Sequence, residues 1–270
     1  MVLATYNWSS VLRHAVRSVL WQTYPNLELL VIGDACTDDS EEVVASFSDE
    51  RVVWRNLEVN SGNQSTPNNV GLEMARGEYV AYQGHDDIWH PRHLAALVSY
   101  LQRGDAEFGC TLAEVLGPPR SRIRHLTGLP REGDPGPGTW LPPTSIAHSA
   151  ELGRRIGGWR TWDEAEGAPD VDFVDRVRSA GTRVVRVPAL TAFKFPSAYR
   201  PGAYRERPSH EQEDYLRRIE RERFFVEREL AGVAWRRISP RKGEAPPRLG
   251  TESGDYRAQR AYLRRVRGLD

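Results

Sequence analysis

The chain has 270 residues, and its 37 lysines and arginines balance its 37 aspartates and glutamates, so the formal net charge at pH 7 is zero. This balance gives no sign of a nucleic-acid partner, because such proteins carry an excess of clustered positive charge. The length suits one large α/β domain, or one domain with an appendage. The two cysteines form no disulfide framework, no apolar run approaches the roughly 20 residues that span a bilayer, and no N-terminal signal is present. We therefore expect a soluble cytoplasmic protein.

Strands and helices alternate through the first hundred residues. Short runs of β-forming residues predict strands, and apolar residues at helical spacing predict helices. The predicted strands cover residues 2–5, 27–32, 51–55 and 79–82, and the predicted helices cover residues 11–20, 41–47, 67–76 and a stretch that opens at Pro91. This order with short links implies a mostly parallel sheet covered by helices.

The second half of the chain is less regular. Strands are predicted at 107–116, 144–148 and 182–187, helices at 150–156 and 171–180, a long surface loop at 117–138, a linker at 196–208, and two helices at 211–230 and 256–266. We therefore divide the chain into an α/β domain over residues 1–195 and a charged helical extension over residues 196–270.

Polar turns follow two of the predicted strands. Asp34 follows the strand at 27–32, and Asp86 and Asp87 follow the strand at 79–82. Open α/β sheets place their ligands at such strand ends. Adjacent carboxylates repel each other unless a cation or a set of donors joins them, and a hard divalent ion bound also by substrate phosphates is the simplest solution. The alternative is a solvated turn before the helix.

Five spaced segments carry a resemblance to a known family. They read ATYN at 4–7, SVLWQTYP at 18–25, GDACTDDS at 33–40, ARGEYVA at 75–81 and HDDIWHP at 85–91. In this order they resemble the signatures of family 2 glycosyltransferases with the GT-A fold, closely over residues 1–103 and not after about residue 196. The resemblance implies a nucleotide-diphosphosugar donor, a divalent metal (Mn²⁺ or Mg²⁺), inversion at the anomeric carbon, and a place in cell-wall or polysaccharide biosynthesis.

The resemblance also assigns a nucleotide site. It comprises Ala4, Thr5, Tyr6, Asp34, Asn68, His85 and Asp86. Asp34 matches the aspartate that accepts a hydrogen bond from the base, and an ionised carboxylate suits the imide N–H of uracil, which favours a UDP-sugar. Tyr6 matches an aromatic residue that lies against the base, and Asn68 stands near a position where many members carry arginine. The alternatives are a turn aspartate for Asp34 and simple packing for Tyr6.

For the metal, the resemblance points to Asp86 as the final residue of the D-x-D motif. Gly84 stands where the first aspartate of that motif usually lies. We therefore expect His85 or Asp87 to compensate, or the site to bind metal weakly. His90 and His93 lie near these residues in sequence, but their position around a helix start favours surface or packing roles.

For the general base, the resemblance points to Asp170, with Asp172 as the second candidate. A sugar hydroxyl must lose its proton as it attacks, and a positioned carboxylate can accept that proton. Both aspartates also suit a helix start, Asp170 as its N-cap and Asp172 through the helix dipole. Pro169 replaces the glutamate that is common in the family at this point.

Aromatic residues and a histidine in the second half are further candidates. Trp140, Trp159 and Trp162 are candidates to stack on a sugar, although a tryptophan after two glycines, as at 159, is more typical of a core. His148 is a candidate for the acceptor cleft, with a structural role as the alternative.

The C-terminal extension allows two interpretations. Arginines and glutamates interleave over residues 211–230, which is typical of a solvated, ion-paired helix face. Peripheral contact with an anionic membrane, where a lipid-linked acceptor would lie, is the alternative. The apolar residues 224–226 and 230 would dock this helix on the domain or on a second subunit in a homodimer.

Rival functions differ in their motifs. The Gly-rich, Lys-bearing loop that a nucleotidyltransferase would need is absent from this sequence. A dinucleotide-dependent oxidoreductase would need G-x-G-x-x-G after the first strand, where ATYN stands instead. We predict a metal-dependent, inverting glycosyltransferase acting on a saccharide, lipid-linked or small-molecule acceptor. A non-catalytic nucleotide-sugar binding protein of the same fold is the alternative, because Gly84 and Pro169 depart from the family pattern.

Overall fold

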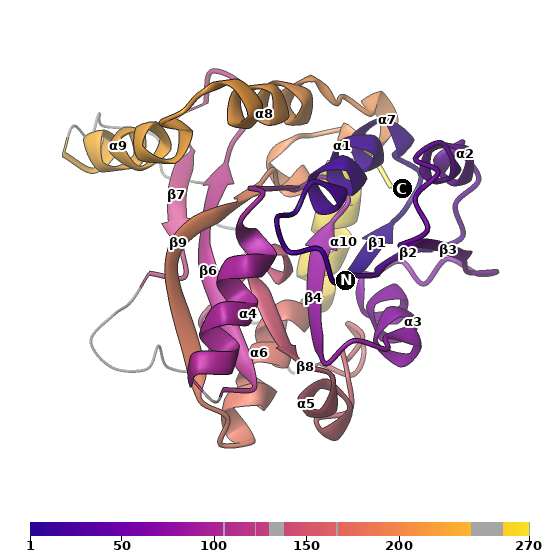
Figure 1. Ribbon diagram of the computed structural model, residues 1–270. Coiled ribbons are helices and arrows are strands. Elements are labelled where there is room, and N and C mark those ends of the chain that lie inside the picture. The colour runs from indigo at the N-terminus through magenta and orange to yellow at the C-terminus, as the bar shows by residue number, and fades with distance from the viewer. Residues whose placement is uncertain (105, 122, 130–137, 166, 239–255, 270) are drawn as a thin grey trace.

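A single nine-stranded sheet runs through the centre of the molecule (Figure 1). The computed structural model describes residues 1–104, 106–121, 123–129, 138–165, 167–238 and 256–269. The strands are β1 (Val2–Thr5), β2 (Leu29–Gly33), β3 (Val52–Asn56), β4 (Tyr79–Gly84), β5 (Ile88–Trp89), β6 (Phe108–Leu116), β7 (Arg124–Thr127), β8 (Ile146–Ser149) and β9 (Val184–Lys194). Their order is β3-β2-β1-β4-β8-β6-β9-β5, and β7 pairs with β6.

The first four strands form the parallel half of the sheet. Thr5 of β1 is in register with Gly33 of β2, and Ala4 is in register with Gly84 of β4. The chain therefore leaves β1, β2 and β4 at the same edge of the sheet, and the residues that follow these strands gather there. The predicted strands of this half are confirmed with small changes at their ends.

Ten α-helices surround the sheet in the described part of the chain. They are α1 (Ser9–Leu20), α2 (Ser40–Ala45), α3 (Ser65–Met74), α4 (His93–Gly104), α5 (Ala150–Arg155), α6 (Pro169–Ser179), α7 (Ala203–Glu206), α8 (His210–Arg221), α9 (Phe225–Ile238) and α10 (Tyr256–Arg267), with 3₁₀ turns η1 (Pro143–Ser145) and η2 (Ser197–Tyr199). Alternate strand residues reach opposite faces, since Leu3 packs in a cluster with α1 and α4, whereas Val2 packs in a cluster with α3, α5 and α6.

The second half of the sheet mixes parallel and antiparallel pairs, and two predictions for it were wrong. The predicted loop at 117–138 contains β7, which pairs antiparallel with β6, while residues 122 and 130–137 of that loop lie outside the described residues. The strand predicted to end at residue 187 continues to Lys194. Its register against β6 shifts so that Pro188 and Ala189 have no partner in that ladder. A proline has no N–H to donate to a ladder and is found at such irregularities. Pro188 therefore ended the run of β-forming residues from which the strand was predicted.

The segment after residue 195 packs on the sheet. The predicted linker at 196–208 holds η2 and α7, and the single helix predicted at 211–230 is two helices, because Glu222 adopts an extended conformation between α8 and α9. Leu216 of α8 and Phe225 of α9 join Phe193 of β9 in a third apolar cluster. Of the residues predicted to dock this segment on the domain or on a second subunit (224–226 and 230), Phe225, Val226 and Leu230 pack in this cluster, whereas Phe224 is 60% exposed.

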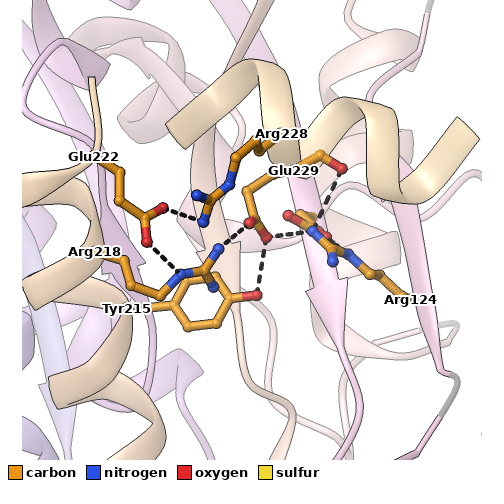
Figure 2. A network of polar contacts seen from close by, with 7 residues as sticks. Arg124, Tyr215, Arg218, Glu222, Arg228 and Glu229 are labelled. Atoms are coloured by element: carbon orange, nitrogen blue, oxygen red, sulfur yellow. Dashed lines mark hydrogen bonds and ion pairs between the residues drawn. The ribbon is translucent and has the colours of Figure 1, made fainter. Parts of the chain in front are cut away.

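A network of charged residues holds α8 and α9 against β7 (Figure 2). The carboxylate of Glu229, which is 2% exposed, forms ion pairs with Arg124 of β7 and Arg218 of α8 and accepts a hydrogen bond of 3.1 Å from the Tyr215 hydroxyl. Arg124 also pairs with the buried Glu114 of β6. The interleaved charges are thus only partly a solvated face. None of the described helices has the length and apolar character needed to span a bilayer.

Candidate active site

A cavity of about 640 Å³ opens where β1, β2 and β4 end. Asp34, Asp86 and Asp170 all line it, although they are far apart in sequence. The seven residues predicted to bind the nucleotide also line it: Ala4, Thr5, Tyr6, Asp34, Asn68, His85 and Asp86. The shared register of the strand ends brings most of these side chains together.

Asp34 follows β2 and is fixed by the loop before α3. Its Oδ1 accepts a hydrogen bond from the Ser61 N–H (2.9 Å), and its Oδ2 accepts from the Asn60 side chain (3.1 Å) and the Gly62 N–H (3.2 Å). Burial raises the pKa of Asp34, and the donors from Ser61 and Gly62 partly offset this effect. An ionised carboxylate has about four acceptor sites, so Oδ1 keeps the capacity to accept one more hydrogen bond.

The loop after β1 is tied to the loop after β2. Asn7 has a positive φ of 42°, and its Oδ1 accepts from the N–H groups of Thr37 (2.7 Å) and Asp38 (3.3 Å). Asp38 accepts in turn from the N–H of Ser9 at the start of α1, at 3.1 Å. These bonds fix the backbone on either side of Tyr6.

Gly84 lies at the end of β4, where the resemblance would place a carboxylate. A Cβ atom there would lie 2.9 Å from Oδ2 of Asp87 and 3.1 Å from Oδ1 of Asp86. A larger residue at this position would therefore displace one of the two carboxylates that follow it.

Asp86 and Asp87 have different environments. Asp86 lines the cavity, and in the part of the chain that the structure describes no hydrogen-bond donor reaches its carboxylate. The side chain of Asp87 is fully buried behind the cavity wall, 3.0 Å from Nζ of Lys194, and its Oδ1 accepts from the Phe195 N–H at 3.1 Å. Burial lowers the pKa of Lys194, but the charges of Asp87 and Asp86 outweigh it and hold that pKa above its ordinary value. Asp87 is engaged by the protein, whereas Asp86 can take an external ligand.

His85 is engaged on both ring nitrogens. Its Nδ1 accepts from the Tyr6 N–H at 3.3 Å and lies 3.1 Å from the Thr5 hydroxyl, and its Nε2 lies 3.2 Å from the Tyr204 hydroxyl. Burial lowers the pKa of His85, and the charge of Asp86 partly offsets this effect. His85 is therefore placed to orient the turn and α7 and has no ring nitrogen left for a metal.

Asp170 faces the cavity from the first turn of α6. Its Oδ2 accepts a hydrogen bond of 2.6 Å from the indole N–H of Trp140, and its Oδ1 accepts from the Val171 N–H at 3.1 Å. The N-cap of α6 is Ala168, so the alternative that Asp170 caps the helix is wrong. Asp170 thus has a carboxylate that is oriented by donors and directed at the cavity.

Asp172 is not part of the cavity wall. Its carboxylate is 2.7 Å from Nε of Arg176 and 3.5 Å from Arg160, and its side chain is 3% exposed. Arg176 also donates to the carbonyl oxygens of Ile156 and Gly158, so this cluster fixes α6 on the turn before it. Asp172 therefore has a structural environment, and Asp170 alone of the two candidates lines the cavity.

The aromatic and histidine candidates divide between cavity and core. Trp140 and Trp162 line the cavity, whereas Trp159 is buried and stacks on Phe173 with ring centroids 4.2 Å apart. His148 is buried beside the Tyr82 hydroxyl at 2.9 Å. His93 stacks on Trp89, which confirms the packing role expected for it.

Several residues of the cavity wall were not predicted from the sequence, among them Lys194, Tyr204, Arg264 and Arg267. Lys194 is one of two lysines in the chain, so its type was a usable signal, but its place at the end of β9 was not, because that strand was predicted to end at residue 187. The other three follow the predicted domain boundary, and nothing in their local pattern indicates that they return to the strand ends.

Asp86 is the predicted metal ligand that lines the cavity. Among the described residues, no group of three or more His, Cys, Asp or Glu side chains is clustered as a metal centre. A divalent ion held by one carboxylate together with substrate phosphates needs no such cluster. With Asp86 in the cavity wall, the arrangement fits a site in which one carboxylate and substrate phosphates hold the ion.

Comparison with known proteins places these features in context. The family model described as glycosyl transferase family 2 matches residues 1–151, more than half of the chain. The chain is 33% identical over 111 residues to the poly(ribitol-phosphate) beta-N-acetylglucosaminyltransferase TarP of Staphylococcus aureus, a match that covers 40% of the chain and 34% of TarP. The matched segments span between 17% and 40% of the length of the curated relatives.

Solved structures show the fold. The chain resembles S. aureus TarS 1–349 in complex with UDP-GlcNAc, with a TM-score of 0.58 and 19% identity over 72% of the chain and 57% of that structure. It also resembles the mannosyltransferase PcManGT of Pyrobaculum calidifontis in complex with GDP-Man and Mn²⁺, with a TM-score of 0.56 and 18% identity over 98% of the chain and 84% of that structure. The predicted GT-A fold is confirmed.

Proposed function

Since the chain belongs to glycosyl transferase family 2, we propose that it transfers a sugar from a nucleotide-diphosphosugar to a hydroxyl group of an acceptor. The observation that carries this proposal is the single cavity that Asp34, Asp86 and Asp170 share. Its volume of about 640 Å³ lies within the range of small-molecule sites. In this proposal Asp34 binds the nucleobase, Asp86 lies beside the diphosphate, and Asp170 faces the acceptor hydroxyl.

The nucleotide binds with its base against Asp34. Three protein donors orient this carboxylate and leave Oδ1 able to accept from the imide N–H of a uracil. Tyr6 lines the same part of the wall and supplies an aromatic surface for the base. This arrangement favours a UDP-sugar as the donor.

The diphosphate binds beside Asp86. Of the two adjacent aspartates, Asp86 alone lines the cavity, and Asp87 is neutralised by Lys194. Asp86 would hold a Mn²⁺ or Mg²⁺ ion together with diphosphate oxygens, and the ion would neutralise the charge that develops on the leaving group. Gly84 leaves the protein one carboxylate for this purpose, so we expect weak metal binding without the nucleotide.

Asp170 acts as the general base in a single displacement. As the acceptor oxygen bonds to the anomeric carbon, the bond from that carbon to the phosphate oxygen breaks, and the nucleoside diphosphate leaves with the electron pair. The Asp170 carboxylate takes the hydroxyl proton, and the Trp140 N–H keeps that carboxylate directed at the cavity. Attack opposite the leaving group inverts the anomeric configuration.

The acceptor enters near Asp170 and the aromatic wall. Trp140 and Trp162 offer flat apolar surfaces to a sugar ring. TarP is named for transfer to poly(ribitol phosphate), and we place the acceptor of this chain in the same broad class of saccharide, lipid-linked or polymeric hydroxyl compounds.

The test is a binding and turnover experiment on the full chain. UDP and GDP are titrated with and without Mn²⁺, with the melting temperature as the readout, because a ligand that binds only the folded state raises it. We expect UDP with Mn²⁺ to give the largest rise, and UDP-sugars to release UDP in the presence of Mn²⁺. A rise without any release would favour the non-catalytic binding protein, and the lack of both would contradict the proposal.

A further inference from the structure

Helix α10 supplies part of the cavity wall. Leu263, Arg264, Arg267 and Leu269, on α10 and just beyond it, line the same cavity as Asp34. A hydrogen bond of 2.8 Å from the Gly202 N–H to the Val266 carbonyl joins the end of α10 to the start of α7. In Figure 1 this helix, drawn in yellow, lies behind α1 and β4. The C-terminal helix thus encloses the site from outside the segment that the family model matches.

Arg264 lies beside the loop that fixes Asp34. A Cβ atom on Gly62 would be 3.2 Å from Nη1 of Arg264, and the N–H of Gly62 donates to Asp34. Nη2 of Arg264 donates to the carbonyl of Leu269 at 3.1 Å, which fixes the side chain across the end of the helix. The guanidinium group is therefore held at the cavity wall.

Arg267 lies three residues further along α10 and lines the same cavity. Nε of Arg267 is buried and has no hydrogen-bond partner in the described part of the chain. Buried donors are nearly always satisfied, so an unsatisfied one in a cavity wall points to a ligand acceptor.

A diphosphate bound in the cavity needs positively charged side chains as partners. The described residues that line it include three arginine or lysine side chains, and that of Lys194 is already matched by Asp87. The wall around α3 offers neutral polar groups only: Asn60, Asn63, Gln64 and Asn68. A diphosphate placed near Asp86 would therefore meet its positive partners on α10.

We propose that Arg264 and Arg267 bind the diphosphate of the donor, so that the C-terminal helix completes the nucleotide-sugar site. This inference rests on the proposed function and identifies residues of the same site. A planar guanidinium group with several donors matches phosphate oxygens in pairs, and such charge-assisted bonds are roughly twice as strong as neutral ones.

The experiment compares nucleoside diphosphates with nucleosides. Isothermal titration calorimetry on the full chain, with and without Mn²⁺, gives the affinities of UDP and uridine, and of GDP and guanosine. We expect Arg267→Gln and Arg264→Gln each to weaken diphosphate binding by about tenfold to a hundredfold and to leave nucleoside binding unchanged. The control is Arg265→Gln, which removes the same charge from an exposed position on α10 and should change neither affinity.

Each outcome decides a separate question. If the folded Arg267→Gln and Arg264→Gln proteins bind UDP and GDP as the wild type does, this inference is wrong while the proposed function stands. If the wild type binds neither diphosphate, the proposed function fails and this inference fails with it. Should a glutamine variant lose its melting transition, Arg267→Lys keeps the charge without the paired donors, and it should bind the diphosphate with intermediate affinity.

Discussion

Residues 1–104 and the described residues after 195 (196–238 and 256–269) both contribute to the wall of one cavity, but they reach it in different ways. In the first region, Asp34 and Asp86 stand directly after strands whose register brings them to one sheet edge. In the second region, Tyr204 and Arg267 reach the cavity on α7 and α10, which are joined by the hydrogen bond from the Gly202 N–H to the Val266 carbonyl. The sheet thus fixes the carboxylates, and the C-terminal segment encloses them.

The sheet side carries the carboxylates of the proposed chemistry, and the C-terminal side encloses the cavity. α6 belongs with the sheet, because its Phe173, Val174 and Val177 are fully buried in the apolar cluster that includes β1 and β4. Asp170 is carried on the same helix and is therefore as rigidly placed as the residues at the strand ends. We expect losses on the sheet side to affect turnover and losses on the C-terminal side to affect binding and stability.

The largest expected effect is on turnover, in Asp170→Asn. The amide cannot accept the hydroxyl proton, so we expect kcat to fall by about 10²–10⁴-fold, while donor binding stays within about twofold, because the base and the diphosphate are bound elsewhere. The measurement is steady-state release of nucleoside diphosphate with acceptor present, beside calorimetric donor binding. Asp175→Asn is the matched control, since it lies on the same helix and does not line the cavity. A kcat near the wild-type value in Asp170→Asn would rule out its role as the base.

The second effect is on the stability of the enclosing segment, in Glu229→Gln. Glu229 is buried between Arg124 and Arg218, and loss of its charge leaves Arg218 without its most buried partner (Figure 2). Breaking a buried pair from one side costs about 3–5 kcal/mol of unfolding free energy. Urea denaturation followed by circular dichroism gives this value.

The control for Glu229 is an exposed glutamate of the same segment. Glu213 pairs with Arg217 at 2.9 Å, and both side chains are about half exposed. Because exposed pairs contribute at most about 1 kcal/mol, Glu213→Gln should barely change the unfolding free energy. Equal losses in the two variants would mean that burial of the network does not set the stability of this segment.

The two regions also differ in how much of them could be predicted from sequence. In residues 1–104, strand, turn and helix signals each lie within a few residues, so the element order and the positions of Asp34 and Asp86 followed from local patterns. The continuation of β9 to Lys194 was missed, because Pro188 interrupts the pattern at an irregularity of the ladder.

The C-terminal contribution was beyond local patterns for a different reason. The alternating charges of α8 and α9 are typical of a solvated helix, and only the fold shows that Glu229 is buried between arginines. Likewise, the return of α10 to the cavity depends on contacts such as Gly202 with Val266, which no periodicity indicates. Asp87 and Asp172 resembled site residues because sequence spacing does not distinguish a carboxylate in a cavity from one bound to Lys194 or Arg176.

The smallest expected effect is on the pH dependence of the unfolding free energy, through His148 on the sheet side. His148 of β8 is buried with its Nε2 2.9 Å from the Tyr82 hydroxyl and its Nδ1 2.7 Å from the Ser149 carbonyl. Burial lowers its pKa from 6.5 to about 4, so the unfolded chain binds this proton more tightly than the folded one. The stabilising contribution of the neutral ring is therefore complete above pH 6.5 and is lost as the pH falls toward 4.

His148→Gln isolates this contribution, because the amide keeps a donor and an acceptor but does not titrate between pH 4 and 8. Urea unfolding at pH 7.5 and pH 5.0 should show the wild type losing about 2 kcal/mol more than the variant over that interval, which is what a pKa difference of this size gives by linkage. Because Glu229 and its arginines stay the same in both proteins, their response to pH cancels in the difference. If the difference in unfolding free energy between the two proteins does not change with pH, the pKa of His148 is the same in the folded and the unfolded chain. Burial of the ring in the sheet side would then add no pH-dependent stability.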